Sequence, residues 1–136
     1  GGLNLFKNKK KIKKFIEMLK KKKIRTSLFI NATIYDVKLS KDLNTDCIEI
    51  HTGKFANLVK ANKNYSKELL RIKKCSFYAS KLGLEVHAGH GLDFTSTKIL
   101  SKIKEITEFN IGHFIIGESI FDGLKKVIKK FKYICK

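Results

Sequence analysis

The chain has 136 residues, 43% of them hydrophobic, and a formal net charge of +18 at pH 7. This length fits one domain with a modest core, and the hydrophobic content excludes a disordered basic tail. No apolar run approaches the roughly 20 residues that a membrane-spanning helix needs, and the first residues lack the pattern of a signal peptide. We therefore expect a globular domain with no membrane partner.

Lysine supplies almost all of the positive charge, because Arg25 and Arg71 are the only arginines. Arginine is preferred for bidentate recognition of phosphates and bases, which weakens a nucleic-acid-binding interpretation without removing it. Ile, Phe and Asn are abundant and Pro is absent, so the composition bias of an A/T-rich genome is the alternative that we favour. Cys47, Cys75 and Cys135 are widely spaced, which predicts reduced thiols in a cytoplasmic setting.

The first half of the chain switches between helical and strand-like periodicity. The predicted elements, in chain order, are a helix over 6–22, a strand over 25–30, a helix over 33–43 and a strand over 47–51 that Thr52-Gly53 terminates. The first helix is expected to bury one apolar stripe, formed by Phe6, Ile12, Phe15, Ile16 and Leu19.

The second half continues the alternation. The predicted elements are a helix over 66–82, a strand over 84–88, a helix over about 95–105 with Thr95 as N-cap, a strand over 108–111, one helical turn over 114–117 and a last helix over 118–134. The helix over 66–82 is expected to bury Leu69, Leu70, Ile72, Phe77 and Leu82. The last helix is expected to bury Ile120, Phe121, Leu124, Val127, Ile128 and Phe131.

Strands that alternate with helices of 10–15 residues predict βαβ units and a parallel sheet. Right-handed crossovers bring the C-terminal ends of such strands to one rim of the sheet. Four strands after a leading helix fit either an open α/β sheet or the C-terminal half of a (β/α)8 TIM barrel with about four βα units. The leading helix, which has no strand of its own, favours the half-barrel.

Two candidate catalytic residues lie in or just after strands, near the rim where βα folds bind ligands. Glu49 lies between two isoleucines, and inside a barrel its carboxylate would suit proton transfer or stabilisation of a cation. His90 lies between Gly89 and Gly91, where it can titrate near neutral pH while the flanking backbone approaches a ligand. A surface carboxylate and a structural turn histidine remain open alternatives.

Gly91, Gly112 and His113 are candidates for binding a phosphate. In TIM barrels, the loops after the last two strands and the start of a short helix form a recurrent phosphate site, where free N–H groups favour an anion. The alternative is that these glycines serve only the chain geometry. A metal site built from His51, His90 and His113 is disfavoured, because no pair has helical spacing and no second carboxylate joins them.

Three segments together carry a resemblance to a known family: Ile48-Glu49-Ile50-His51-Thr52-Gly53, Ala88-Gly89-His90-Gly91-Leu92, and the segment 109–117. They resemble signature blocks of pyridoxine 5′-phosphate synthase in order and nearly in spacing. The resemblance covers essentially the whole chain, with its opening residues similar to the segment that follows the fourth barrel strand. Residues 1–136 are thus expected to be a single partial domain whose N-terminal barrel half is absent, as a start without Met also suggests.

The resemblance implies the condensation of 1-deoxy-D-xylulose 5-phosphate with 3-amino-2-oxopropyl phosphate, which gives pyridoxine 5′-phosphate, phosphate and water. It implies a cytoplasmic homo-octamer with no metal or organic cofactor and no specific nucleic-acid partner. His90 would be the proton donor and Glu49 the residue that stabilises the transition state. Gly91, Gly112 and His113 would bind the phosphate of 3-amino-2-oxopropyl phosphate.

The sequence departs from the family in ways that affect these expectations. The other acid–base residues of the family, a histidine and a glutamate, lie on early strands that this chain does not contain. His87 stands where the family usually has Asn, and Asn31 where Asp is common. We therefore expect the isolated chain to be inactive and to self-associate, and an inactive remnant of the enzyme remains an alternative.

Overall fold

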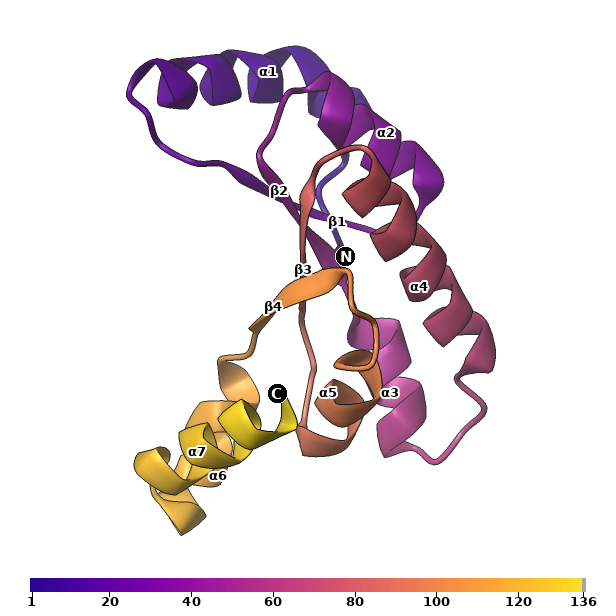
Figure 1. Cartoon of the computed structure of the whole chain (residues 1–136), viewed down its shortest axis with the longest axis vertical. Coiled ribbons are helices and arrows are strands. Elements are labelled where there is room, and N and C mark those ends of the chain that lie inside the picture. Colours follow the sequence, from indigo (N-terminus) through magenta and orange to yellow (C-terminus); the bar gives the residue numbers. More distant parts are fainter. Residues whose placement is uncertain (136) are drawn as a thin grey trace.

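The computed structural model describes residues 1–135 as four strands and seven helices (Figure 1). The strands are β1 (Ser27–Ile30), β2 (Cys47–His51), β3 (Glu85–Gly89) and β4 (Ile106–Asn110). The helices are α1 (Leu5–Lys21), α2 (Ile34–Asp42), α3 (Gly53–Lys60), α4 (Ser66–Lys81), α5 (Phe94–Leu100), α6 (His113–Asp122) and α7 (Leu124–Ile134). None of the helices described in residues 1–135 has both the length and the apolar character to cross a membrane.

All four strands are parallel and lie in the order β1-β2-β3-β4. A doubly wound sheet reverses its strand order at a switch point, whereas a (β/α)8 barrel adds each strand beside the previous one. The observed order confirms the predicted α/β class and is consistent with half of such a barrel. β2, β3 and β4 lead into α3, α5 and α6, which gather at the lower end of Figure 1, with α1 at the opposite end.

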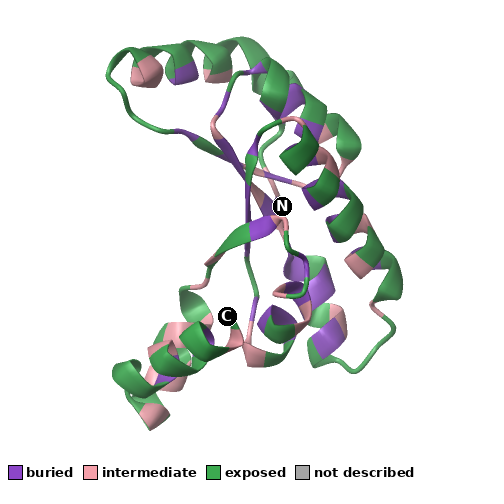
Figure 2. Cartoon of the chain, in the orientation of Figure 1, coloured by how far each residue is buried: buried purple, intermediate pink, exposed green. Residues whose placement is uncertain are grey.

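The two faces of the sheet differ in burial. Ile48 and Ile50 on β2, and Val86 and Ala88 on β3, are at most 1% exposed, because the helices cover this face. The other face is mixed: Glu49 and Asn110 are partly or fully exposed, whereas Cys47 and His87 are buried. Figure 2 shows buried residues along β1, β2 and β3 and on the inner sides of the helices, whereas α6 has no buried residue and α7 buries only Val127 and Phe131. The open face is the one that would line the interior of a barrel.

A β-bulge interrupts the pairing of β3 with β4. Val86 pairs with Ile106, but the next residue, His87, pairs with Glu108, so that Thr107 is an extra residue. The Thr107 hydroxyl donates a hydrogen bond to the Val86 carbonyl oxygen at 3.2 Å. A bulge changes which face the following side chains take. Here it places Glu108, and later Asn110, on the open face of the sheet.

One helix was not predicted. Thr52-Gly53 was expected only to terminate a strand, yet Gly53 is the first residue of α3. Phe55, Ala56 and Val59 of this helix are buried, and their spacing of one and four residues is that of a helix with one apolar face. The glycine at the start of the segment concealed this pattern, since glycine is more typical of a helix end.

The C-terminal helices also differ from the prediction. The chain forms α6 from His113 onward and breaks at Gly123, whose φ of +79° is incompatible with a continuous helix. Val127 and Phe131 are buried as expected, but Ile120, Phe121 and Leu124 were wrongly predicted to be buried: they are 78%, 88% and 54% exposed. The break explains the error for Ile120 and Phe121, because it places them in α6 rather than on the face of α7 that packs inward. Leu124 is the first residue of α7 and is exposed at its start.

Smaller corrections concern three other helices. Asp93, rather than Thr95, is the N-cap of α5, in a capping box with Ser96. In α1 and α4 the apolar stripes are narrower than expected. The side chains that were predicted to be buried but are exposed by about half or more are Phe6, Phe15, Leu70 and Phe77.

Candidate active site

A cavity of about 720 Å³ opens at the C-terminal ends of the strands. Its lining includes all five residues that the sequence suggested as site residues: Glu49, His90, Gly91, Gly112 and His113. They come from β2, from the loop after β3 and from the junction of β4 with α6. The structure thus brings these five residues together around one cavity, as a shared site requires. Their chemical roles remain predictions.

Glu49 reaches diagonally across β3 to the neighbouring strand. Its Oε2 accepts a hydrogen bond from Asn110 Nδ2 at 2.8 Å. Gly89 lies between the two, and a Cβ built on it would overlap Glu49 Oε1. A glycine is therefore required at this position for Glu49 to adopt this orientation. The donor is a neutral amide. It therefore holds the Glu49 carboxylate in place and leaves the negative charge of Glu49 available to a ligand in the cavity.

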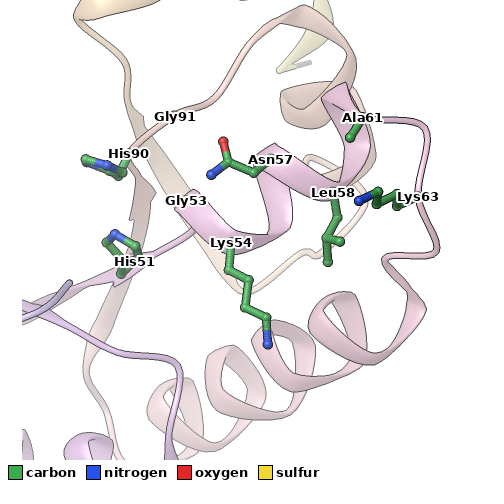
Figure 3. A pocket seen from close by; sticks show the side chains of 9 residues that line it. All are labelled: His51, Gly53, Lys54, Asn57, Leu58, Ala61, Lys63, His90 and Gly91. Atoms are coloured by element: carbon green, nitrogen blue, oxygen red, sulfur yellow. The ribbon is translucent and has the colours of Figure 1, made fainter.

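His90 has an unusual backbone conformation and an exposed side chain. Its φ is +82°, a region that residues other than glycine seldom occupy. Its ring stacks on that of His51, with centroids 4.7 Å apart and an interplanar angle of 27°, and Figure 3 shows the two rings side by side at the edge of α3. Strained residues of this kind cluster at functional sites. The conformation therefore supports a functional interpretation of His90.

His51 has a pKa below its ordinary value. Burial is the larger cause, because it disfavours the charged imidazolium, and repulsion by the neighbouring His90 adds to it. Phe29 packs against both rings, with centroid distances of 5.3 Å to His51 and 6.3 Å to His90. His51 is therefore less readily protonated than an ordinary histidine.

The start of α6 offers backbone donors to the cavity. Gly112 is the N-cap and has no side chain that could satisfy the first N–H groups of the helix. A Cβ at Gly112 would meet nothing within 4 Å, so packing alone does not require a glycine there. Gly91, across the cavity, has a φ of +75° that favours glycine. An uncapped helix start is a suitable place for an anion.

Potential metal ligands gather elsewhere. Within residues 1–135, the one group of three side chains with ligand atoms within 4.8 Å of one another is Cys47, Glu85 and His87, near the N-terminal ends of the strands. The Arg25 guanidinium forms an ion pair with Glu85 in this group. A metal site at His51, His90 and His113 was considered from the sequence and disfavoured. These three histidines do not form such a group.

Sequence reasoning missed two contributors to the site. Asn110 lies in the segment 109–117 that resembles the family, but no role in the site was assigned to it from the sequence. It is two residues from Glu108, and alternation along the strand places both side chains on the same face. His51 was considered only as a metal ligand. Its position at the end of the strand that carries Glu49 was the available signal, but the stacking on His90 depends on a contact between the end of β2 and the loop after β3, 39 residues apart in sequence.

Comparisons with known proteins point to one family. Residues 1–136 match the family model described as "Pyridoxal phosphate biosynthesis protein PdxJ". A pyridoxine 5′-phosphate synthase of Pelagibacter ubique is 66% identical over 134 residues, which are 98% of this chain and 56% of the relative. Proteins of the same name from a Sulfurihydrogenibium species and from Zymomonas mobilis are 45% and 41% identical, each over 98% of this chain and over 54% and 52% of the relative.

The chain spans about half the length of the curated relatives that it matches. The family match, by contrast, extends from the first residue of the chain to the last. It includes the strands, the loops after them and the start of α6, which are the parts that form the cavity. The chain therefore belongs to the pyridoxal phosphate biosynthesis protein PdxJ family.

Proposed function

We propose that this chain supplies the C-terminal half of a pyridoxine 5′-phosphate synthase barrel. The complete enzyme would condense 1-deoxy-D-xylulose 5-phosphate with 3-amino-2-oxopropyl phosphate and release pyridoxine 5′-phosphate, phosphate and water. The observation that carries this proposal is the single cavity lined by Glu49, His90 and the start of α6. The relatives named pyridoxine 5′-phosphate synthase support the same activity.

In this proposal, His90 is the proton donor. Its ring is exposed at the cavity, where it can protonate an oxygen that leaves as water or phosphate. Glu49 stabilises the transition state: condensation of an amine with a ketone develops positive charge on nitrogen, and a preorganised carboxylate favours that charge. The hydrogen bond from Asn110 holds Glu49 in place without neutralising it.

The phosphate of 3-amino-2-oxopropyl phosphate is proposed to bind between Gly91 and the Gly112–His113 junction. The first N–H groups of α6 would donate hydrogen bonds to it, and the helix dipole favours the negative charge. Lys60 also lines this cavity and adds a positive charge. This region would thus bind one substrate through its phosphate while His90 and Glu49 act on the reacting end.

The proposal extends to the assembly and its setting. β1 and β4 are the two edges of the sheet in this chain, and a closed barrel would pair both with strands from the other half. We propose a cytoplasmic homo-octamer for the complete enzyme and no cofactor. The cysteines Cys47, Cys75 and Cys135 are all unpaired, which fits a reducing compartment.

A chimera tests the proposed function. The part of the Pelagibacter ubique relative that precedes the matched region would be joined to Gly1 of this chain, and formation of pyridoxine 5′-phosphate from the two substrates would be measured. We expect product from the chimera and none from the 136-residue chain alone. A folded chimera without activity would refute the function, and product from the chain alone would refute its dependence on a second half.

A further inference from the structure

Thr52 joins β2 to α3 and is completely buried. It occupies the N-cap of α3, where a threonine hydroxyl ordinarily accepts a hydrogen bond from the first turn of its helix. Here it makes no such bond. Instead, Oγ1 lies 2.6 Å from the Gly89 carbonyl oxygen and 2.8 Å from the His90 carbonyl oxygen. Because carbonyl oxygens only accept, the hydroxyl donates to this pair rather than capping its own helix.

These two carbonyls belong to the two peptide units that flank the Cα of His90. Holding both fixes the backbone dihedral angles on either side of that atom. The Thr52 N–H adds a third contact, since it donates to the Gly89 carbonyl oxygen at 2.9 Å. His90 needs such support, because its φ of +82° is unfavourable for a residue with a Cβ and its neighbour Gly91 is flexible.

The residues on either side of Thr52 contact the His90 ring. A Cβ on Gly53 would lie 2.8 Å from His90 Cδ2 and 2.9 Å from His51 Cε1, so the absence of a side chain leaves room for both rings. His51 supplies the stacked ring at a centroid distance of 4.7 Å. Figure 3 shows His51, Gly53 and His90 close together at the start of α3. The loop after β2 thus constrains His90 through both its backbone and its ring.

We infer that Thr52 is a positioning residue, which holds His90 in the strained conformation that points its imidazole toward the cavity. Thr52 is buried and acts through His90 rather than on the reacting atoms. The catalytic part of this inference rests on the proposed function, whereas the structural part concerns only the conformation of His90. The two parts are therefore tested separately.

The catalytic test compares Thr52→Val with Thr52→Ser in the chimera. Valine keeps the shape of threonine but removes the donor, whereas serine keeps the donor. We expect Thr52→Val to lower kcat by about tenfold to hundredfold, as expected for a misplaced catalytic group, with KM changed by less than about twofold. Thr52→Ser should stay within about threefold of the parent kcat. Thr52→Ala is a second donor-free variant should valine prevent folding.

Thr45→Val is the matched control. Thr45 is also buried, and its hydroxyl also donates to carbonyl oxygens, those of Thr26 at 3.0 Å and Cys47 at 3.2 Å, but near the N-terminal ends of the strands. This variant loses a comparable hydrogen bond without touching His90. Its kcat should equal that of the parent even where its stability falls.

The structural test needs no turnover. NMR spectra of the labelled histidine rings, with the His90 signal assigned by its loss in His90→Asn, should show a shifted or broadened His90 signal in Thr52→Val but not in Thr52→Ser or Thr45→Val. Unchanged His90 signals and kcat in Thr52→Val, or a serine variant as impaired as the valine variant, would overturn the inference. An inactive parent chimera whose His90 signal still responds to Thr52→Val would instead refute the proposed function alone.

Discussion

The two ends of the sheet carry the same residue types and yet differ in character. On the open face, Glu49 and His90 line the cavity at the C-terminal end, whereas Glu85, His87 and Glu108 form a network that begins at the N-terminal end of β3 and extends to His87, the register partner of Glu49. Both groups therefore combine a carboxylate with a histidine. In a (β/α)8 barrel the C-terminal end is where catalysis occurs and the N-terminal end supports stability, so the chain offers an internal comparison of the two uses.

In the network around His87, each carboxylate has a partner. His87 is buried, with Nε2 2.9 Å from Glu85 Oε1 and Nδ1 3.5 Å from Glu108 Oε1. Arg25 pairs with the other oxygen of Glu85. The pKa of Glu85 is lowered, first by the hydrogen bond from His87 and then by that from Arg25. These side chains balance one another, which is the behaviour of a structural network.

At the C-terminal end, the groups are held but not neutralised. Glu49 is fixed by the amide of Asn110, and His90 is exposed, strained and stacked on another histidine. Both line a cavity of about 720 Å³. Residue type therefore does not separate a functional from a structural cluster. Backbone strain, neutral partners and an adjacent cavity do.

Replacing the histidine at each end should give the largest contrast. In the chimera, we expect His90→Asn to lower kcat by about 10²- to 10⁴-fold, the usual contribution of a general acid. Asparagine tolerates a positive φ, so this variant removes the imidazole without adding backbone strain. His87→Asn, the matched change in the paired network, should leave kcat within a few-fold of the parent, because His87 does not line the cavity. Equal losses in both variants would remove the distinction between the two ends.

Filling the space beside Glu49 should give an intermediate effect. Gly89→Ala places a methyl group against Glu49 Oε1 and near the Asn110 carbonyl oxygen, so we expect a loss of about 1–3 kcal/mol in the free energy of unfolding together with reduced activity. Gly117→Ala is the control, because a Cβ there meets nothing within 4 Å and alanine favours the helix. Denaturant unfolding would measure both, and a Gly89→Ala protein as stable as Gly117→Ala would contradict the described geometry.

Titration of the N-terminal network should give the smallest effect. Since the pKa of Glu85 in the folded chain is below its ordinary value of 4.5, its stabilising contribution is complete above that pH and is lost as the pH falls through the lowered value. Glu85→Gln should therefore melt below the parent at pH 7, by less than Gly89→Ala does. The two melting temperatures should converge at pH values well below 4.5. A difference that persists in acid would show that the Glu85 charge is not what stabilises this end.

Much of the fold could be predicted from sequence because apolar residues alternate along β2 and β3, and glycines or polar residues follow each strand. The second strand, Cys47–His51, was predicted with its observed bounds. The helix that begins at Gly53 was missed because a glycine after a strand resembles a stop. The break at Gly123 was missed because the apolar pattern runs on through it, and a single positive φ decides where α6 ends.

The site residues were identified from their places after strands, but the contacts among them were not. The hydrogen bond from Asn110 to Glu49 joins residues 61 positions apart. It depends on strand register and on the missing side chain at Gly89, and neither follows from local periodicity. Likewise, Thr52 resembles an ordinary N-cap in sequence, and only the approach of the loop after β3 redirects its hydroxyl.

The extra residue in β4 determines which side of the sheet the following side chains face. Ile106 and Asn110 are four positions apart, so in a regular strand both side chains would point to the same side, toward the helices. Because Thr107 is absorbed by the bulge, the even count becomes effectively odd, and Asn110 turns toward Glu49 while Phe109 turns away. Opposite Gly89, insertion of one residue within β4 would therefore replace the Asn110 amide by the Phe109 ring, and loss of one residue would replace it by the Ile111 side chain, unless the bulge compensated for the change.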